Sequence, residues 1–575
     1  MSNIPDAYEK VPMMFQAQTN GRCQLQRLDT ERKADPKKNK PREPQDAEIW
    51  AEEWTSETYP VAPIFEKPVK TQEYTISWRF VTNSGQDDGV IRPVIGASGY
   101  PFYPGSSMKG AFRQACKRLF SDRLGKYCGQ EISKGDFSPG ILRFHGGYPI
   151  DDSWTDGLVD LVHPQQPRQV MDSSRTSAFI QISLYQPTIQ FGISASEELD
   201  ESEWEEIWQI WEAALGRGIG CRVSAGYGHR DQLKGELLYP PHLLKGQGMA
   251  SKRLDESGEF RPNIFRAAIR GHALRIFGGL TDAEKAKIEV ERLFGGVSGG
   301  GTWGLLAMNF VTKQIDEKIF GNGQWEVPSY EVEGELGWLL SQEISEVHKI
   351  ALKNLILHLN QFAMIFGGFG KSWRRADHRL FYEEYYEDNN YRKPLIGCHW
   401  QWKKLYGRDV QVYNLKQIST FLNKLQEAAR VWLGLQDVNL GESYAGGWRE
   451  AWHADKVQVW GRIAGDRDSS EAIHWLHKPY QNRDTTAHIP ELLIKGSSVT
   501  GKMGQIGRLW HRMYPLKKLV PDPKDSTKKI VRHTEQYIEL LTIFPDKYDK
   551  CLDFLDFLAE DGRFQQLWGK PWEIE

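Results

Sequence analysis

Pro104-Gly105-Ser106-Ser107-Met108-Lys109-Gly110-Ala111-Phe112-Arg113 sets the organisation of this chain, because the same pattern returns further along the sequence. Apolar residues recur at helical spacing from Met108 onwards, so the stretch predicts a tight turn that opens into a helix. We expect Ser106 or Ser107 to cap the first free amides. Lys109, Arg113 and Lys117 fall at i, i+4 and i+8 and therefore share one face. A helix N-terminus beside cations suits a phosphate, although an ordinary capped helix with a solvated basic face is the interpretation we favour for this stretch taken alone.

A second copy of the pattern begins at Arg261 and stays in gapless register through Phe277, 157 positions after the first. The aligned pairs are Ser106 with Asn263, Lys109 with Arg266, and Arg113 with Arg270. Asn263 is therefore expected to cap the second helix. A third, partial copy restores the Gly-Ser-Ser turn at Gly496-Ser497-Ser498 and ends at Lys502. A matched cap, matched cations and a matched apolar stripe indicate a repeated structural module.

Each of the first two modules also carries a glycine-rich loop, at 216–229 and at 367–375. Predicted helices at 203–215 and 347–366 precede them. A dinucleotide-binding motif requires a strand before the glycines, so this interpretation of the first loop is rejected. A P-loop at the second loop is disfavoured, because a helix precedes it as well and Ile365 stands where the first glycine of the motif would be. Within the second module, Thr281 and Glu284 have the spacing of a capping box at the start of another helix.

The order strand, helix, strands, helix, glycine loop is consistent with a βαββαβ module, which is ferredoxin-like, and the fold class is α+β. We expect tandem modules of this kind with insertions and a C-terminal extension. The predicted domains are an N-terminal arm or irregular segment at 1–70, a first module at 71–243, a second module at 244–385, an insertion or accessory helical region at 386–490, and a C-terminal part at 491–575 that contains the third turn and completes the second module.

Charge and cysteine usage limit the possible function classes. The chain of 575 residues has 73 basic and 76 acidic side chains, so a polyanion must be held by local patches. Six scattered cysteines without a CxxC pair argue against a zinc module or a disulfide framework and suit a reducing cytosol. We see no signal peptide and no apolar run of membrane-spanning length, so we expect a cytoplasmic protein.

Several of these motifs resemble the RAMP superfamily of CRISPR effector proteins. The resemblance rests on the stretch Tyr103–Arg113, on the loop Gly218–Gly228, on Gly140–Phe144 and on Val159–Pro164. The first module is similar to the small capping RAMP subunit of type III-B (Cmr) complexes, and the second is more similar to the two-module RAMP subunit at the same end. The pair thus resembles a fused, multi-RAMP subunit of a type III effector, similar to a III-D variant. The usual lysine after the glycine loop is Cys221-Arg222 here, which departs from the family pattern.

The resemblance implies an RNA-binding structural subunit of a type III CRISPR ribonucleoprotein surveillance complex, used in antiviral defence. It would hold crRNA and the crRNA–target RNA duplex through its turns and glycine loops, by contacts to the backbone. Tyr227, His229 and Trp373 are candidates for base stacking, with core packing as the alternative. Other RAMP proteins and a large subunit would be its partners, with no membrane and no cofactor. The predicted RNA-binding residues are Ser106, Ser107, Lys109, Arg113, Lys117, Gly218, Gly220, Arg222, Tyr227, His229, Arg266, Arg270, Gly368, Gly370, Lys371, Arg374, Arg375, Ser497, Ser498 and Lys502.

An alternative is an endoribonuclease. RAMP backbone subunits cleave target RNA with an aspartate in the loop before the turn, and Asp87 and Asp88 occupy such a loop. A carboxylate there would position Mg²⁺ or activate a ribose hydroxyl, and Mg²⁺ is expected only in this case. The sequence Gly85-Gln86-Asp87-Asp88-Gly89 also makes an ordinary polar turn, which is the interpretation we favour. A third option is an RNA-processing nuclease with His145 or His163 as its base.

Overall fold

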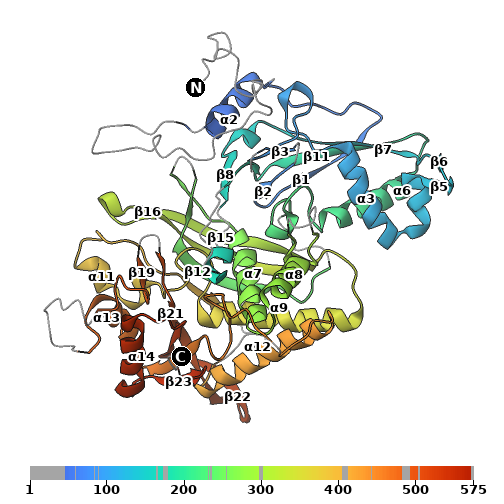
Figure 1. The fold of residues 1–575 in the computed structure, drawn as a ribbon. Helices are drawn as coiled ribbons and strands as arrows, with labels where there is room; N and C mark the ends of the chain where they lie inside the picture. Colours follow the sequence, from blue (N-terminus) through green and yellow to red (C-terminus); the bar gives the residue numbers. More distant parts are fainter. Residues whose placement is uncertain are drawn as a thin grey trace, which may run out of the picture.

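Three antiparallel sheets with one common strand order run through the chain, and Figure 1 shows them in a row from the N-terminal to the C-terminal part. The computed structural model describes Pro44 and residues 46–571 except 59, 83–84, 88–89, 163–165, 172–178, 231, 233–235, 254–255, 297–301, 404–411, 442, 482–492 and 503–504. We call the parts built around the three sheets the first, second and third units.

The first unit has the sheet order β1-β11-β7. Its main elements are β1 (Lys70–Thr75), α3 (Gly105–Leu119), β7 (Leu142–Pro149), β11 (Thr188–Ala195) and α6 (Glu201–Leu215). A single antiparallel bridge between Ile76 and Arg230 adds the chain after α6 beside β1. The order is therefore fourth, first, third, second, which is that of a ferredoxin-like βαββαβ unit.

The second unit repeats this order with four full strands, as β15-β16-β12-β17. Its elements are β12 (His242–Met249), α7 (Asn263–Gly278), α8 (Ala283–Phe294), β15 (Leu306–Phe320), β16 (Val327–Leu340), α9 (Glu346–Phe366) and β17 (His399–Trp402). The fourth strand, β17, comes from the stretch predicted as an insertion and pairs with β12. The predicted α+β fold of tandem modules is confirmed.

The third unit has the order β21-β22-β18-β23, again second, third, first, fourth. Its elements are β18 (Gln458–Ala464), α13 (Glu471–His477), β21 (Leu509–Asp522), β22 (Asp525–Ile543), α14 (Asp549–Asp561) and β23 (Gln565–Trp568). These strands pair with one another, whereas the C-terminal part was expected to complete the second module. The numerical domain limits stay a prediction.

Shorter elements connect and cover the units. They are α2 (Asp46–Glu57), β2 (Arg79–Phe80), β3 (Gly85–Asp87), β4 (Val90–Arg92), α4 (Leu124–Cys128), β5 (Gln130–Ser133), β6 (Asp136–Ser138), β8 (Val159–Val162), α5 (Gln166–Met171), β9 (Phe179–Ile182), β10 (Leu184–Tyr185), β13 (Ser251–Lys252), β14 (Gly258–Glu259), α10 (His378–Phe381), α11 (Glu384–Glu387), α12 (Lys416–Gly434), β19 (Gly501–Lys502) and β20 (Gln505–Ile506). None of the described helices is long and apolar enough to cross a bilayer.

Two large cores hold these elements together. In the first unit α3 buries Met108, Phe112, Ala115 and Cys116, the spacing of one helix face, against β7 and α6. Full burial of each large apolar side chain contributes about 1.5–3 kcal/mol. A second, continuous core runs through the second and third units and includes Phe362 of α9 and Trp510 of β21. The second and third units therefore share one core, the third unit has a further cluster around Trp475 and Phe554, and the first unit has a core of its own.

Candidate nucleic-acid interface

The first turn begins α3 directly at Gly105. The carbonyl of Pro104 accepts a hydrogen bond from the Met108 amide at 2.9 Å, and Pro104 is the N-cap. The predicted capping by Ser106 or Ser107 is wrong, because the helix starts before both residues and no side chain caps it. Gly105 is required by close packing, since a Cβ there would lie 2.0 Å from the Phe144 carbonyl oxygen of β7. Both serines are exposed in the first helical turn.

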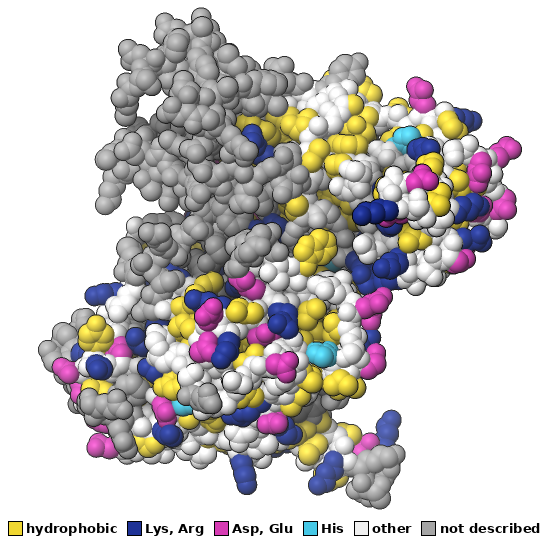
Figure 2. All heavy atoms as spheres, turned by 45° about the vertical axis from the view of Figure 1, so that its right-hand side comes forward, with side chains coloured by type: hydrophobic (Ala, Val, Ile, Leu, Met, Phe, Trp, Pro, Cys, Tyr) yellow, Lys and Arg dark blue, Asp and Glu magenta, His cyan; other side chains and the backbone are white. Residues whose placement is uncertain are grey.

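The predicted cationic face of α3 is present. Lys109, Arg113 and Lys117 are all exposed. Arg113 donates a hydrogen bond to the Gly129 carbonyl at 3.3 Å, and within the described residues none of the three cations forms an ion pair. Figure 2 shows Lys and Arg side chains spread over this upper part of the molecule, with acidic side chains among them. The first turn therefore presents exposed hydroxyls, and cations that form no ion pair with a carboxylate in the described part of the chain.

The first glycine loop folds back on itself beneath β2. Gly218, Gly220 and Gly228 have φ of 82°, 81° and 68°, the left-handed region that favours glycine. The Ile219 amide donates to the Gly228 carbonyl at 3.0 Å, and a Cβ on Gly228 would lie 1.8 Å from the Ile219 carbonyl oxygen. Glycine is therefore needed here for a tight fold of the backbone as well as for any close approach of a ligand.

Tyr227 and His229 of this loop are buried, with 0% and 1% of their surface exposed. The Tyr227 hydroxyl donates to Asp160 at 2.6 Å, and burial raises the Tyr227 pKa. Burial lowers the pKa of His229 to about 4, so its ring is neutral near pH 7. Trp373 of the second loop is only 5% exposed. No base can reach these three rings in this conformation, and core packing is the role that the structure gives them.

Arg222, at the tip of the first glycine loop, lies beside α7 of the second unit. Burial, followed by the charges of Arg270 and Arg222, lowers the pKa of Arg266 to about 9. Arg266 donates to the Phe294 carbonyl, and its Nε is buried with no hydrogen-bond partner among the described residues. The loop of the first unit and the helix of the second thus bring three arginines together. Such a cluster is suited to an anion placed between the two units.

The turn before α7 is built into the protein. The helix begins at Asn263 with Pro262 as its N-cap, so the predicted Asn263 cap is wrong; no side chain caps it. Arg261, just before, is buried and pairs with Asp160 at 2.8 Å and with Glu259 at 3.1 Å. Glu259 also pairs with the fully buried Arg79 at 2.7 Å. This network joins the first unit, which contributes Arg79 and Asp160, to the second.

The predicted capping box of α8 is also different in the structure, because Asp282 and not Thr281 provides the cap.

The second glycine loop divides its cations between solvent and protein. Gly368 and Gly370 have φ of 133° and 96°, and Lys371 after them is exposed. Arg374 donates two hydrogen bonds to the buried carboxylate of Glu450, at 2.6 and 3.1 Å. Arg375 donates to the carbonyls of Leu509 and of Thr500, the latter at 3.3 Å. Of the three predicted cations of this loop, only Lys371 points to solvent.

The third turn does not open a helix. Ser497 donates to the Ile494 carbonyl at 2.6 Å, and the chain continues from the turn into β19. Ser498 is partly buried, while Lys502 is exposed. The Thr500 carbonyl of this turn accepts from Arg375. The glycine loop of the second unit therefore lies on the turn of the third, as the loop of the first unit lies on the turn-helix of the second. The structure thus brings each predicted glycine loop together with the turn of the following unit. Neither of the two described glycine loops lies on the first turn.

Of the candidate catalytic residues, the structure describes Asp87 and His145. Asp87 ends β3, which pairs with β4, whereas Asp88 and His163 lie outside the described residues. His145 is hydrogen-bonded to Ser194, with 2.8 Å between Nε2 and Oγ. No group of three or more His, Cys, Asp or Glu side chains in the described parts is arranged to hold a metal ion.

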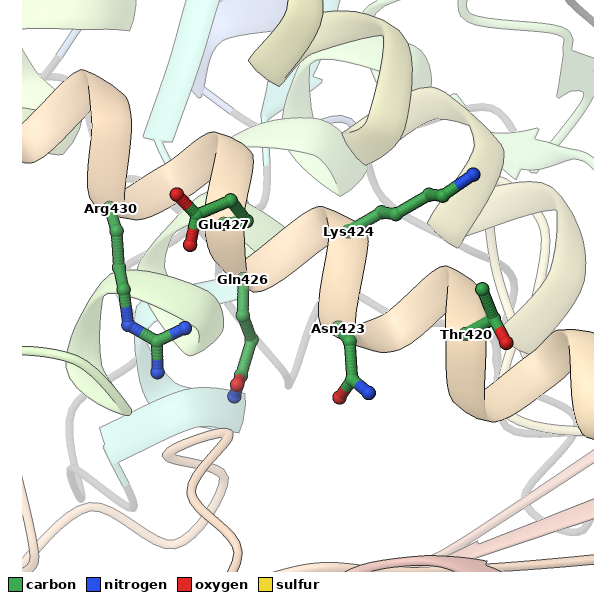
Figure 3. Close-up of a pocket in the computed structure, with 6 residues that line it drawn as sticks. All are labelled: Thr420, Asn423, Lys424, Gln426, Glu427 and Arg430. Atoms are coloured by element: carbon green, nitrogen blue, oxygen red, sulfur yellow. The ribbon is translucent and has the colours of Figure 1, made fainter.

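A small-molecule pocket is not a strong feature of the described surface. Figure 3 shows six polar side chains that line a shallow hollow on α12, from Thr420 to Arg430. They come from one helix and spread along it rather than converge on a point. An enzyme site for a small ligand normally draws convergent groups from several elements. This hollow has the character of an ordinary helix surface.

Sequence reasoning missed the buried carboxylates Asp160, Glu259 and Glu450, which hold the arginines between units. Asp160 lies in the Val159–Pro164 motif, but nothing in its spacing predicts a partner. Buried ion pairs join residues far apart in the sequence, such as Arg275 and Glu450, 2.7 Å apart. Only the fold brings such partners together.

Strand order and loop position define the chain as an array of ferredoxin-like units. No protein-family model and no curated protein matches the sequence. Among solved structures, a chain of a "Type IV-B CRISPR Complex" matches with 18% identity and a TM-score of 0.21. The match covers 28% of this chain and 86% of that chain. The similarity to this CRISPR complex subunit thus extends over part of the chain.

Proposed function

We propose that the protein is an RNA-binding structural subunit of a type III CRISPR ribonucleoprotein complex, holding crRNA and the crRNA–target duplex together with other RAMP proteins and a large subunit. The observation that carries the proposal is the exposed first turn, with Lys109, Arg113 and Lys117 free of ion pairs in the described residues. Support also comes from the arginine cluster between the first and second units. Such sites hold a phosphate backbone without reading its sequence.

Replacing Lys109 and Arg113 together by alanine tests backbone binding. We expect weaker binding to crRNA-length RNA and a dependence of log affinity on log salt that is shallower by about 1 to 2, because up to two phosphate contacts are lost. Fluorescence anisotropy at several salt concentrations measures both quantities. The matched control is the double alanine variant of Lys416 and Lys424, exposed cations of α12. Unchanged affinity and slope in the Lys109/Arg113 variant would sink the proposal.

The endoribonuclease alternative is separated by cleavage mapping in the assembled complex. As a structural subunit, the protein with Asp87→Ala and Asp88→Ala should leave every target-RNA cleavage position unchanged, with Mg²⁺ present. Loss of one cleavage position, with RNA binding and assembly retained, would instead assign a catalytic carboxylate to this loop.

We expect RNA binding to depend on pH through the charge of Lys371. Surrounding protein atoms, and then the charges of Arg261 and Lys252, lower its pKa to about 8. The charged form holds a phosphate, so RNA affinity should fall, by up to about tenfold, as pH rises from about 7 to about 9. Lys371→Arg should flatten this profile because arginine keeps its charge. Anisotropy titrations at the two pH values check the prediction, and equally steep profiles for both proteins would contradict it.

A further inference from the structure

Four ring side chains form a row on the open face of the first sheet. Ring centroids lie 4.7 Å apart for Phe102 and Tyr148, 6.1 Å for Tyr148 and Phe65, and 6.2 Å for Phe65 and His145. His145 is exposed and the other three rings are partly exposed. We call this row the ring platform.

Strand alternation places the platform on the side away from the helices. Phe191 of β11 is fully buried and its ring meets Trp211 of α6 at 5.0 Å. The next residue, Gly192, faces the other way, because a Cβ there would lie 3.1 Å from the Phe65 ring. His145 belongs to this open side as well, since it bonds Ser194, the neighbour of the buried Ile193. The absence of a side chain at Gly192 is what lets Phe65 lie close to the sheet.

The platform is continuous with the first turn. Tyr103, just before the turn, exchanges two backbone hydrogen bonds of 2.9 Å with Gly147, the residue before Tyr148. Gly105 packs on the carbonyl of Phe144, the residue before His145. A strand of RNA whose phosphate lies at Ser106 and Lys109 therefore has its adjoining nucleotides within reach of these rings.

We propose that the ring platform stacks unpaired bases of the RNA strand whose backbone the first turn holds. This inference rests on the proposed function and names its ligand as single-stranded RNA. Ring faces accept bases of any sequence, and the His145–Ser194 pair adds hydrogen-bonding groups at one end of the row. A duplex keeps its base faces covered and does not fit. Charges near the platform include the exposed cation Arg143, the exposed Glu66 and Lys67 after Phe65, and the acid Glu73, which accepts a hydrogen bond from Gln190 at 3.1 Å.

The test compares Tyr148→Leu and Phe65→Leu, which remove a ring but keep apolar bulk, with Trp303→Leu. Trp303 is the control because it is 84% exposed in the second unit. Single-stranded RNA carrying 2-aminopurine reports stacking through its fluorescence. Each ring variant should bind the single strand about 5- to 100-fold more weakly and with less quenching. The salt slope should stay unchanged, because no phosphate contact is lost. Duplex RNA should bind as before.

Tyr148→Trp guards against a folding effect, because it keeps a ring and should retain stacking. If the leucine variants bind single strands like the unaltered protein, or if Tyr148→Trp loses as much as Tyr148→Leu, the platform does not stack bases. The proposed function fails separately, through an unchanged salt slope in the Lys109/Arg113 variant. A changed slope there with unaffected ring variants overturns the ring platform alone.

Discussion

Replacing Glu259 by alanine is expected to lower the free energy of unfolding where the first and second units meet by about 3–5 kcal/mol, the cost of removing one partner of a buried ion pair. Arg79 and Glu259 are 0% and 1% exposed, and the carboxylate accepts from Arg79 at 2.7 and 3.1 Å. Trp78 and Arg261 also donate to it, at 3.0 and 3.1 Å. Without Glu259, Arg79 keeps its charge in a site that excludes water.

Hydrogen exchange as a function of denaturant measures this loss, because it resolves the units of a chain that does not unfold in one step. Lys70→Ala is the matched control, since its pair with Glu201 in the same unit is exposed and should change stability by less than about 1 kcal/mol. The double variant Arg79→Met with Glu259→Leu should lose less than Glu259→Ala, because no buried charge is left alone. Equal protection in Glu259→Ala and in the unaltered protein would contradict the expected role of this pair.

Glu450→Ala should have an effect of similar size, about 3–5 kcal/mol, at the contact between the second and third units. Glu450 is 0% exposed and pairs with Arg275 at 2.7 Å, with Arg374 at 2.6 Å and with Arg449 at 3.4 Å. Its removal leaves several guanidinium groups close together beside Trp510, which Arg275 and Arg374 both approach. We expect amides of β21 to exchange faster, while those of β1 in the first unit do not.

The same carboxylate predicts sensitivity to acid. Burial alone would raise the pKa of Glu450, but the charges of Arg374 and Arg275 hold it below its usual range. A carboxylate with a lowered folded pKa stabilises the protein above its unfolded value and loses this contribution as pH falls through the folded value. Protection of β21 should therefore decrease in acid in the unaltered protein, and less so in Glu450→Ala. Lys313→Ala, which breaks an exposed pair with Glu335, is the control and should leave β21 unchanged.

Helical periodicity predicted these helices, because α3, α6 and α12 each bury one apolar face, and α9 buries one face before its last two turns, which are buried on all sides. The third unit was not recognised as a full module. Its helix after the first strand, α13, has seven residues, and its Gly-Ser-Ser turn leads into β19. Without a turn that opens a helix, only the short Gly-Ser-Ser turn of the repeated pattern aligns in this unit.

The sequence predicted which cations lie in the turns and glycine loops, but not which of them bind other groups of the protein. The cations of α3 are exposed as expected, whereas Arg374 and Arg375 bind protein groups. Arginine pairs equally well with a phosphate and with a carboxylate, so sequence position alone does not separate the two uses. The sequence left core packing and base stacking both open for Tyr227 and Trp373, because their neighbours in space, Asp160 and Trp510, are distant in sequence.

Arg375 donates a hydrogen bond to the carbonyl of Thr500, which lies 125 positions later in the sequence. The ribosome therefore completes the second glycine loop well before it makes the turn on which this loop packs. At about 5–20 residues per second, that interval is on the order of 6 to 25 s. During this time Arg375 lacks its carbonyl partners, Arg374 lacks the Glu450 carboxylate for the first 76 positions, and the apolar residues of α9 that face Trp510 stay uncovered. Ribosome-bound chains that end before position 500 should therefore bind chaperones more strongly than full-length chains do. A premature stop in the third unit would damage the second unit as well.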